Sequence, residues 1–334
     1  MENKRRDPSI DILRFIALVG IIIAHIQPPE FLFQLRNFDV PMMVFLSGIA
    51  FSLSNGKKES YRKYVWKRFK RLMLPTMIFV LIYVLWLYFR GFGITPIDKA
   101  VFTYFLAVSG NGFYTWIIRI FFIIALFAPF VAKLVQRTSL KKYFILIVCT
   151  LCINEGLCIA YHGPVYDLFI MNISYIAIFS FGAIANKFNR KELKTIMLIA
   201  FAIFVVIALI LYCLTGNYIN TQDYKYPPQI YYIAYALGTI VLLYLYKDKI
   251  TAFFKKVSLT RCCTFIGSHT IWIYFWHIII LDMVKGQYNW GIRFLITIAA
   301  ATLITLIQNI LIQRLSNKIT NSKIRKNLQI LFAG

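Results

Sequence analysis

Two ionisable side chains, Arg14 and His25, lie eleven residues apart in the first apolar stretch of the chain, IDILRFIALVGIIIAHI. An ionisable group is costly in hydrocarbon, so a membrane helix that keeps one is expected to use it. The unperturbed pKa of imidazole is near neutral, so His25 could accept a proton from a weak nucleophile. A guanidinium is always charged and binds phosphate groups well. The pair therefore predicts acid–base chemistry and anion binding on one helix.

Three further ionisable residues within apolar segments are candidates for the same site: Arg119, Glu155 and His277. At 1.5 Å per residue from the predicted cytoplasmic side, His25, Glu155 and His277 lie roughly 18 to 22 Å into the membrane, with Arg119 at a similar depth. Arg14 lies only ~6 Å in. We expect His25, His277, Glu155 and Arg119 to share one layer, with His277 and Glu155 as catalytic candidates. The structural alternatives are a Glu155–Arg119 ion pair and a hydrogen-bonded interior histidine at position 277.

A dense basic and aromatic segment, NGKKESYRKYVWKRFKR, occupies residues 55–71. Arg68 and Arg71 are three residues apart, so they share one face of a helix and could hold a phosphorylated ligand. The alternative is a basic and aromatic stop at the membrane surface. The segment alone does not decide between these interpretations.

The composition predicts an all-α membrane protein. Of the 334 residues, 60% are hydrophobic and only 15% are charged, and the mean hydropathy is +0.68. Such values indicate helices that cross a bilayer. We expect a single membrane domain over residues 1–334, without an extra soluble domain, and a short interfacial or re-entrant segment at 100–108. Ten spans are predicted, at roughly 10–27, 40–54, 72–89, 113–135, 143–161, 167–186, 195–214, 229–246, 263–284 and 291–313.

The basic residues predict the orientation of these spans. Of the 37 Lys and Arg residues, 29 fall in the segments that would be cytoplasmic and six in the opposite loops. This bias places both termini in the cytoplasm. It also accounts for the net charge of +24, because the basic residues are spread over every inner segment. Membrane lipids are therefore the expected partners of this charge, and nucleic acid is not.

The six cysteines predict no disulfide framework, because most of them fall within apolar segments. Cys149 and Cys152 have the C-x-x-C spacing of some metal and redox sites, but no second pair accompanies them. We therefore expect no metal site.

The order and spacing of several motifs resemble the acyltransferase-3 family, integral-membrane enzymes that O-acetylate bacterial surface polysaccharides and peptidoglycan. The resemblance covers almost the whole chain. One departure is His269, where a small or hydrophobic residue is more usual. The matching residues are Arg14-x10-His25, Val40-Pro-Met-Met-Val-Phe-Leu-Ser47-Gly48, Arg68-x-x-Arg71 before Pro75, Trp116 after Gly110-Asn-Gly112, and Ile266-Gly-Ser-His-Thr-Ile-Trp-Ile-Tyr274-Phe-Trp-His277.

The resemblance implies an O-acetyltransferase of the bacterial cytoplasmic (inner) membrane. It would carry an acetyl group from cytoplasmic acetyl-CoA to a hydroxyl of a surface polysaccharide or a lipid-linked oligosaccharide. His25 would act as general base, and a covalent acetyl-His25 intermediate is the alternative. Whether the donor carries acetyl or a slightly larger group such as succinyl stays open. Glycan-synthesis proteins are the expected partners.

The resemblance also implies a path for the donor. Arg68 and Arg71 would bind the nucleotide phosphates, and Arg14 would bind the pyrophosphate or line the channel. About 16 Å of helix separates Arg14 from His25, a length that the extended pantetheine arm can bridge. Asp11 is expected to orient Arg14. Three motif residues are expected either to form the wall of this site or to hydrogen bond to the substrate: Ser47, Trp116 and Tyr274.

Two other classes of protein remain open. A glycan or lipid transporter or flippase would also keep charges within the membrane, but the chain lacks the paired repeats and the broken helices in both halves that such proteins usually show. A non-catalytic polysaccharide assembly subunit would keep the spans without needing His25.

Overall fold

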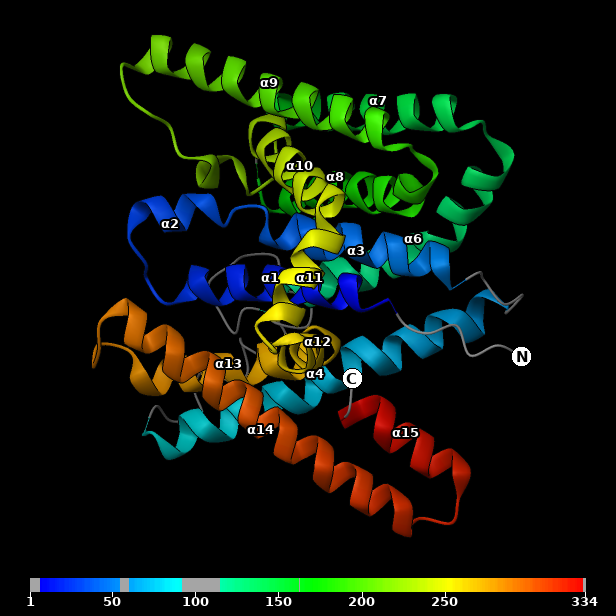
Figure 1. Cartoon of the computed structure of the whole chain (residues 1–334), viewed down its shortest axis with the longest axis vertical. Coiled ribbons are helices and arrows are strands. Elements are labelled where there is room, and N and C mark those ends of the chain that lie inside the picture. Colours follow the sequence, from blue (N-terminus) through cyan, green and yellow to red (C-terminus); the bar gives the residue numbers. More distant parts are fainter. Residues whose placement is uncertain (1–6, 55–59, 92–114, 162, 333–334) are drawn as a thin grey trace.

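The computed structural model describes residues 7–54, 60–91, 115–161 and 163–332, and the chain is all-helical within them (Figure 1). The segment predicted to be re-entrant, 100–108, lies outside the described residues. The elements are α1 (Pro8–His25), α2 (Glu30–Leu35), α3 (Asp39–Leu53), α4 (Tyr61–Phe89), α6 (Trp116–Arg137), α7 (Leu140–Ala160), α8 (Pro164–Ile184), η1 (Ala185–Lys187), α9 (Arg190–Thr215), η2 (Thr221–Tyr224), α10 (Ile230–Leu245), α11 (Lys247–Lys256), α12 (Thr260–Ser268), α13 (Thr270–Val284), α14 (Trp290–Lys318) and α15 (Ser322–Phe332).

Local sequence signals set the start of two long helices. The Asp7 side chain accepts the backbone N–H of Ser9 at 2.9 Å, and Pro8 occupies the first turn of α1. Helix α9 begins with a reciprocal capping box, in which Asn189 accepts the N–H of Glu192 and Glu192 accepts that of Asn189. These caps satisfy backbone donors that the first turn of a helix leaves without partners.

Helices α1 and α3 lie in the middle of the molecule, with α7 and α9 along one end and α14 and α15 at the other (Figure 1). Both central helices are largely buried, whereas α9 buries only 6% of its most apolar window. Large apolar side chains such as Leu198, Leu209 and Leu214 are therefore exposed on α9. An apolar face of this extent suits contact with lipid chains.

Two glycines allow α3 and α8 to pack closely. A Cβ atom at Gly48 of α3 would collide with the backbone of Phe179, and one at Gly182 of α8 would collide with the backbone of Phe45. Small residues at such crossings let membrane helices approach until their backbones touch. The Ser47–Gly48 motif thus fixes α3 against α8, beside the pocket described below.

The predicted multi-pass helical bundle is confirmed, but the count of ten spans is not. Among the described residues, seven helices are long and apolar enough to cross a membrane, or nine when two bent pairs each count as one span. Helix α3 falls at the predicted place and has only 15 residues, which is short for a span. The side on which the termini lie stays a prediction.

The helix that contains the predicted third span, 72–89, begins well before residue 72. Helix α4 begins at Tyr61 and continues without a break through Pro75 to Phe89, a length of 29 residues or about 43 Å. Lys and Arg are good helix formers, so the basic turns extend the apolar helix toward its N-terminus. Residues 61–71 are therefore helical and continuous with the apolar part of α4, and their position at the membrane surface stays a prediction.

The predicted ninth span, 263–284, is also not one continuous helix. It consists of α12 and α13, which meet at His269 with a bend of 88°. The His269 ring contacts the Phe265 carbonyl and the Ser268 hydroxyl on one side and the Asn309 amide on the other. These contacts hold the histidine at the break, where its polar ring has partners within the bundle.

Candidate functional site

A pocket of about 320 Å³ lies among α1, α3, α4, α6, α12 and α13. Its polar lining includes five residues that the sequence motifs single out, from four different helices, and α6 contributes more of its apolar lining than any other helix. The pocket therefore brings together most of the residues predicted to bind the donor. These five residues are Arg14, Ser47, Arg68, Arg71 and Tyr274.

One face of α1 forms part of the pocket wall. Arg14, Leu18 and Ile21 line the pocket, and His25 follows at the next helical position of that face. The predicted contact between Asp11 and Arg14 is present, with 3.1 Å from Asp11 Oδ1 to Arg14 Nη1. Asp11 is buried, whereas the Arg14 side chain keeps 20% of its surface exposed. The aspartate thus holds a guanidinium that still faces the pocket.

The basic face of α4 forms the charged mouth of the pocket. Arg68 and Arg71 both line it, together with Tyr64. The Arg68 guanidinium carbon lies 5.2 Å from the centre of the Tyr64 ring, which is a cation–π contact. Ring contact of this kind orients the planar guanidinium and leaves its N–H groups able to bind an anion.

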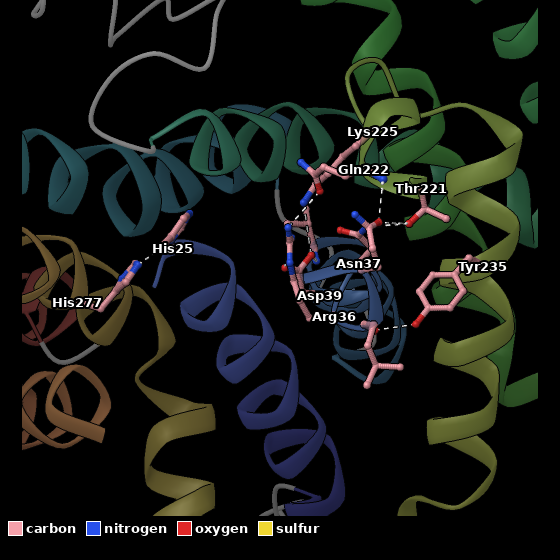
Figure 2. Close-up of polar contacts among 12 residues, drawn as sticks. His25, Arg36, Asn37, Asp39, Thr221, Gln222, Lys225, Tyr235 and His277 are labelled. Atoms are coloured by element: carbon pink, nitrogen blue, oxygen red, sulfur yellow. Dashed lines mark hydrogen bonds and ion pairs between the residues drawn. The ribbon is translucent and has the colours of Figure 1, made fainter. Parts of the chain in front are cut away.

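His25 and His277 contact each other, as their shared depth predicts. His25 Nδ1 lies 2.9 Å from His277 Nε2, and the rings are nearly parallel, with 5.1 Å between their centres (Figure 2). His277 is fully buried, and its Nδ1 contacts the backbone carbonyl of Tyr274. The Tyr274 ring, which also lines the pocket, lies 4.9 Å from the His277 ring. Tyr274 thus connects the pocket with the histidine pair.

The Tyr274 carbonyl determines how protons are distributed in this pair. A carbonyl only accepts, so Nδ1 of His277 carries the hydrogen and its Nε2 keeps a lone pair in the neutral ring. His25 must then donate its Nδ1 hydrogen to His277. This leaves a lone pair on Nε2 of His25, the atom that a general base or a nucleophile needs.

The other predicted site residues have different neighbours. Glu155 accepts the backbone N–H of Ile230 at 2.7 Å and so caps the start of α10. That the four ionisable groups share one layer stays a prediction; the contacts join His25 with His277, and Glu155 with the start of α10. Trp116 packs edge-on against Tyr226. Neither Trp116 nor Arg119 is among the residues that line the pocket.

The sequence motifs missed a buried polar group next to these histidines, which we call the loop cluster. It joins the start of α3 to the loop before α10 (Figure 2). Two of its members, Arg36 and Lys225, are among the six basic residues of the loops predicted to be outside. Basic residues are rare in loops on that side of a membrane protein. The presence of these two was therefore the sequence feature that could have revealed the cluster. The loop cluster consists of Arg36, Asn37, Asp39, Thr221, Gln222 and Lys225.

Within the described part of the chain, no group of His, Cys, Asp and Glu is arranged to hold a metal ion. The apolar helical bundle is that of a multi-pass membrane protein. Its guanidinium-lined pocket and its histidine pair are groups suited to acyl transfer. The family model described as an acyltransferase domain, that of the acyltransferase-3 family, matches residues 7–314. The chain therefore belongs to this family and is a membrane acyltransferase. A search of the curated proteins and a search of the solved structures found no match.

Proposed function

We propose that this protein transfers an acetyl group from cytoplasmic acetyl-CoA to a hydroxyl of an extracytoplasmic or lipid-linked glycan. It would work in the bacterial cytoplasmic membrane, together with the proteins that synthesise the glycan. The acceptor is a surface polysaccharide or a lipid-linked oligosaccharide.

The observation that carries this proposal is the continuous face of α1. Arg14 lies at one end of this face, Leu18 and Ile21 line the pocket, and His25 follows at the other end. A donor bound by its phosphates near Arg14 could thus present its acetyl group toward His25, about 16 Å further along the helix. The apolar residues of α6 that line the pocket suit the uncharged part of such a donor.

In the proposed reaction, His25 acts as general base. The acceptor hydroxyl gives its proton to Nε2 of His25 while its oxygen attacks the thioester carbonyl carbon. The carbon–sulfur bond breaks, and the CoA thiolate leaves and takes the proton from His25. His277 is a positioning residue in this scheme, because it holds the His25 ring by Nδ1 and keeps the lone pair on Nε2. The same lone pair would serve a covalent acetyl-His25 intermediate.

The donor's phosphates are proposed to bind at the mouth of the pocket. Arg68 and Arg71 supply forked donors that match phosphate oxygens, and Arg14 supplies a third guanidinium from α1. Three guanidinium groups from two helices suit a ligand with several phosphates. The phosphates of a donor with a slightly larger acyl group, such as succinyl, would bind at the same mouth of the pocket. The larger acyl group would differ in its contacts near His25.

The two other classes of protein have less support. Within the described residues, the two bent pairs, α10–α11 and α12–α13, both fall in the C-terminal part of the chain, whereas a transporter built from repeats breaks helices at corresponding places in both halves. A non-catalytic assembly subunit gives no reason for a buried histidine to hold a second histidine in one tautomer.

Inside-out membrane vesicles given radiolabelled acetyl-CoA test the proposal. We expect label to move to glycan in the wild type and not in His25→Ala. A matched control is His269→Ala, which removes a histidine of the helix break outside the pair. If as much label reaches glycan in His25→Ala as in the wild type, His25 is not the base. If no label reaches glycan in the wild type, the acetyltransferase assignment is contradicted.

A further inference from the structure

The loop cluster is centred on one carboxylate that two cations share. Arg36 Nη1 lies 3.0 Å from Asp39 Oδ2, and Lys225 Nζ lies 3.6 Å from Asp39 Oδ1. Arg36 Nη2 also donates to Gln222 Oε1 at 3.1 Å. All three charged side chains are buried, with 5% or less of their surface exposed.

The loop cluster carries one excess positive charge. The charged groups that act on Lys225 are Asp39 and Arg36, within the described residues. Burial, chiefly, and Arg36 lower the pKa of Lys225 while Asp39 raises it, and together these effects bring it to about 8. A buried cation without a full counter-charge is unfavourable. The cluster is therefore suited to receive a negative charge from outside the chain.

Several hydrogen-bond donors lie around this charge. In the ranges that the structure describes, Arg36 Nε is buried without a hydrogen-bond partner. The hydroxyls of Tyr175 and Tyr232 are also buried and interact with each other, which leaves the hydrogen of one of them for an anionic oxygen. Lys225 Nζ lies 5.9 Å from the centre of the Tyr232 ring. Both tyrosines also act electrostatically on Asp39 and so belong to the same surroundings. Buried donors without partners, next to excess positive charge, are the groups that bind an anionic oxygen.

The loop cluster lies next to the outer end of α1, which carries His25. A Cβ atom on Gly20 would lie 3.0 Å from Cβ of Asp39 and 3.7 Å from Cβ of Arg36, so α1 packs directly on these residues. Both Arg36 and Lys225 act electrostatically on His25. Figure 2 shows the histidine pair and the loop cluster on either side of the end of this helix.

We infer that the loop cluster binds an anionic oxygen group of the acceptor, a phosphate or a carboxylate, and so brings a neighbouring hydroxyl to His25. This inference rests on the proposed function and adds the chemical class of the acceptor. The carboxylate of an acidic sugar and the phosphate of a sugar–lipid carrier present the same chemistry to Arg36 and Lys225. Lys225 is then a specificity-determining residue.

The test is binding to the purified full-length protein in lipid nanodiscs, without acetyl-CoA. The probes are methyl glucuronide, which has a carboxylate, glucose 1-phosphate, which has a phosphate, and methyl glucoside, which is neutral. We expect at least one anionic probe to bind about tenfold more tightly than the neutral probe. The probe that binds identifies carboxylate or phosphate as the source. Equal binding of all three probes, or binding of none, overturns the inference.

Lys225→Gln should remove this preference, and Lys225→Arg should keep it. The matched control is Lys285→Gln, which removes an exposed lysine on the same predicted side of the membrane. A merely structural role would weaken binding of the charged and neutral probes together and would not be rescued by arginine. That result overturns the inference.

A pH series on the wild type tests the inference without any variant. The ammonium of Lys225 is charged below its pKa of about 8 and loses its charge above it. The preference for the anionic probe should therefore fall as the pH rises from ~7 to ~10. A preference that stays constant over this range overturns the inference. Because acetyl-CoA is absent, failure of acetyl transfer leaves this binding result intact, and loss of the preference leaves the assignment of His25 intact.

Discussion

Two aspartate–arginine pairs with the same spacing lie on either side of the site, and their surroundings differ. Asp11–Arg14 and Arg36–Asp39 are both three residues apart, with nitrogen–oxygen distances of 3.1 and 3.0 Å. Arg14 keeps 20% of its side chain exposed and lines the pocket, whereas Arg36 is buried and shares Asp39 with Lys225. The first pair presents a guanidinium to a ligand, and the second also holds a loop in place. Burial, and not spacing, separates the two roles.

The largest expected effect is on catalysis, at His25. His25→Ala should lower the rate of acetyl transfer by roughly 10² to 10⁴-fold, which is the usual contribution of a general base. Binding of CoA, measured separately by calorimetry, should change little, because Arg14, Arg68 and Arg71 remain. Equal losses of binding and rate would show that His25 acts on the fold and not on the reaction.

The buried pair should be the more sensitive one to loss of its carboxylate. Asp39→Asn leaves the charges of Arg36 and Lys225 buried without a counter-charge, which costs about 3–5 kcal/mol of stability. Thermal unfolding in detergent measures this. If Asp39→Asn unfolds at the same temperature as the wild type, the loop cluster is solvated or electrically neutral in the folded protein.

Substitutions at the mouth of the pocket should weaken the binding of CoA. Arg68→Ala with Arg71→Ala removes two charge-assisted donors, so the dissociation constant for CoA should rise roughly 10- to 100-fold while kcat falls less. The matched control is Arg62→Ala with Lys63→Ala, two exposed basic residues of the same helix that do not line the pocket. An equal effect of both double variants would reduce the role of α4 to general electrostatic attraction.

His277 allows a test of positioning with a conservative rescue. His277→Leu removes the acceptor for the Nδ1 hydrogen of His25, and kcat should fall about tenfold with little change in KM. His277→Gln keeps an acceptor oxygen and should recover part of the loss. If His277→Leu and His277→Gln have the same rate, His277 does not control the tautomer of His25.

The smallest effect on stability is expected at the pocket pair. Asp11→Asn should lower the free energy of unfolding less than Asp39→Asn does, because the partly exposed Arg14 can be solvated whereas Asp39 serves two buried cations. It should still weaken CoA binding, since Arg14 loses its fixed orientation. A loss of stability as large as that of Asp39→Asn would remove the contrast between the two pairs.

The pocket was predictable to a useful degree because its residues belong to motifs within single helices. Arg14, Arg68 and Arg71 were identified from residue type and position, Ser47 and Tyr274 from the family resemblance, and the structure places all of them around one cavity. The depth count was a weaker guide. It placed His25 and His277 at one level correctly, but depth gives no information about the direction around the bundle axis. Glu155 therefore lies against the start of α10 instead.

The sequence by itself determined the apolar helices, the basic face of α4 and the face of α1 that joins Arg14 to His25. These features depend on hydrophobicity and on the period of 3.6 residues, which are local properties of the chain. Only the tertiary structure decided that residue 25 meets residue 277 and that residues 36 and 39 meet residue 225. Such contacts depend on which helices pack side by side, and the burial that they create turns two ordinary loop cations into a charged group beside the reaction site.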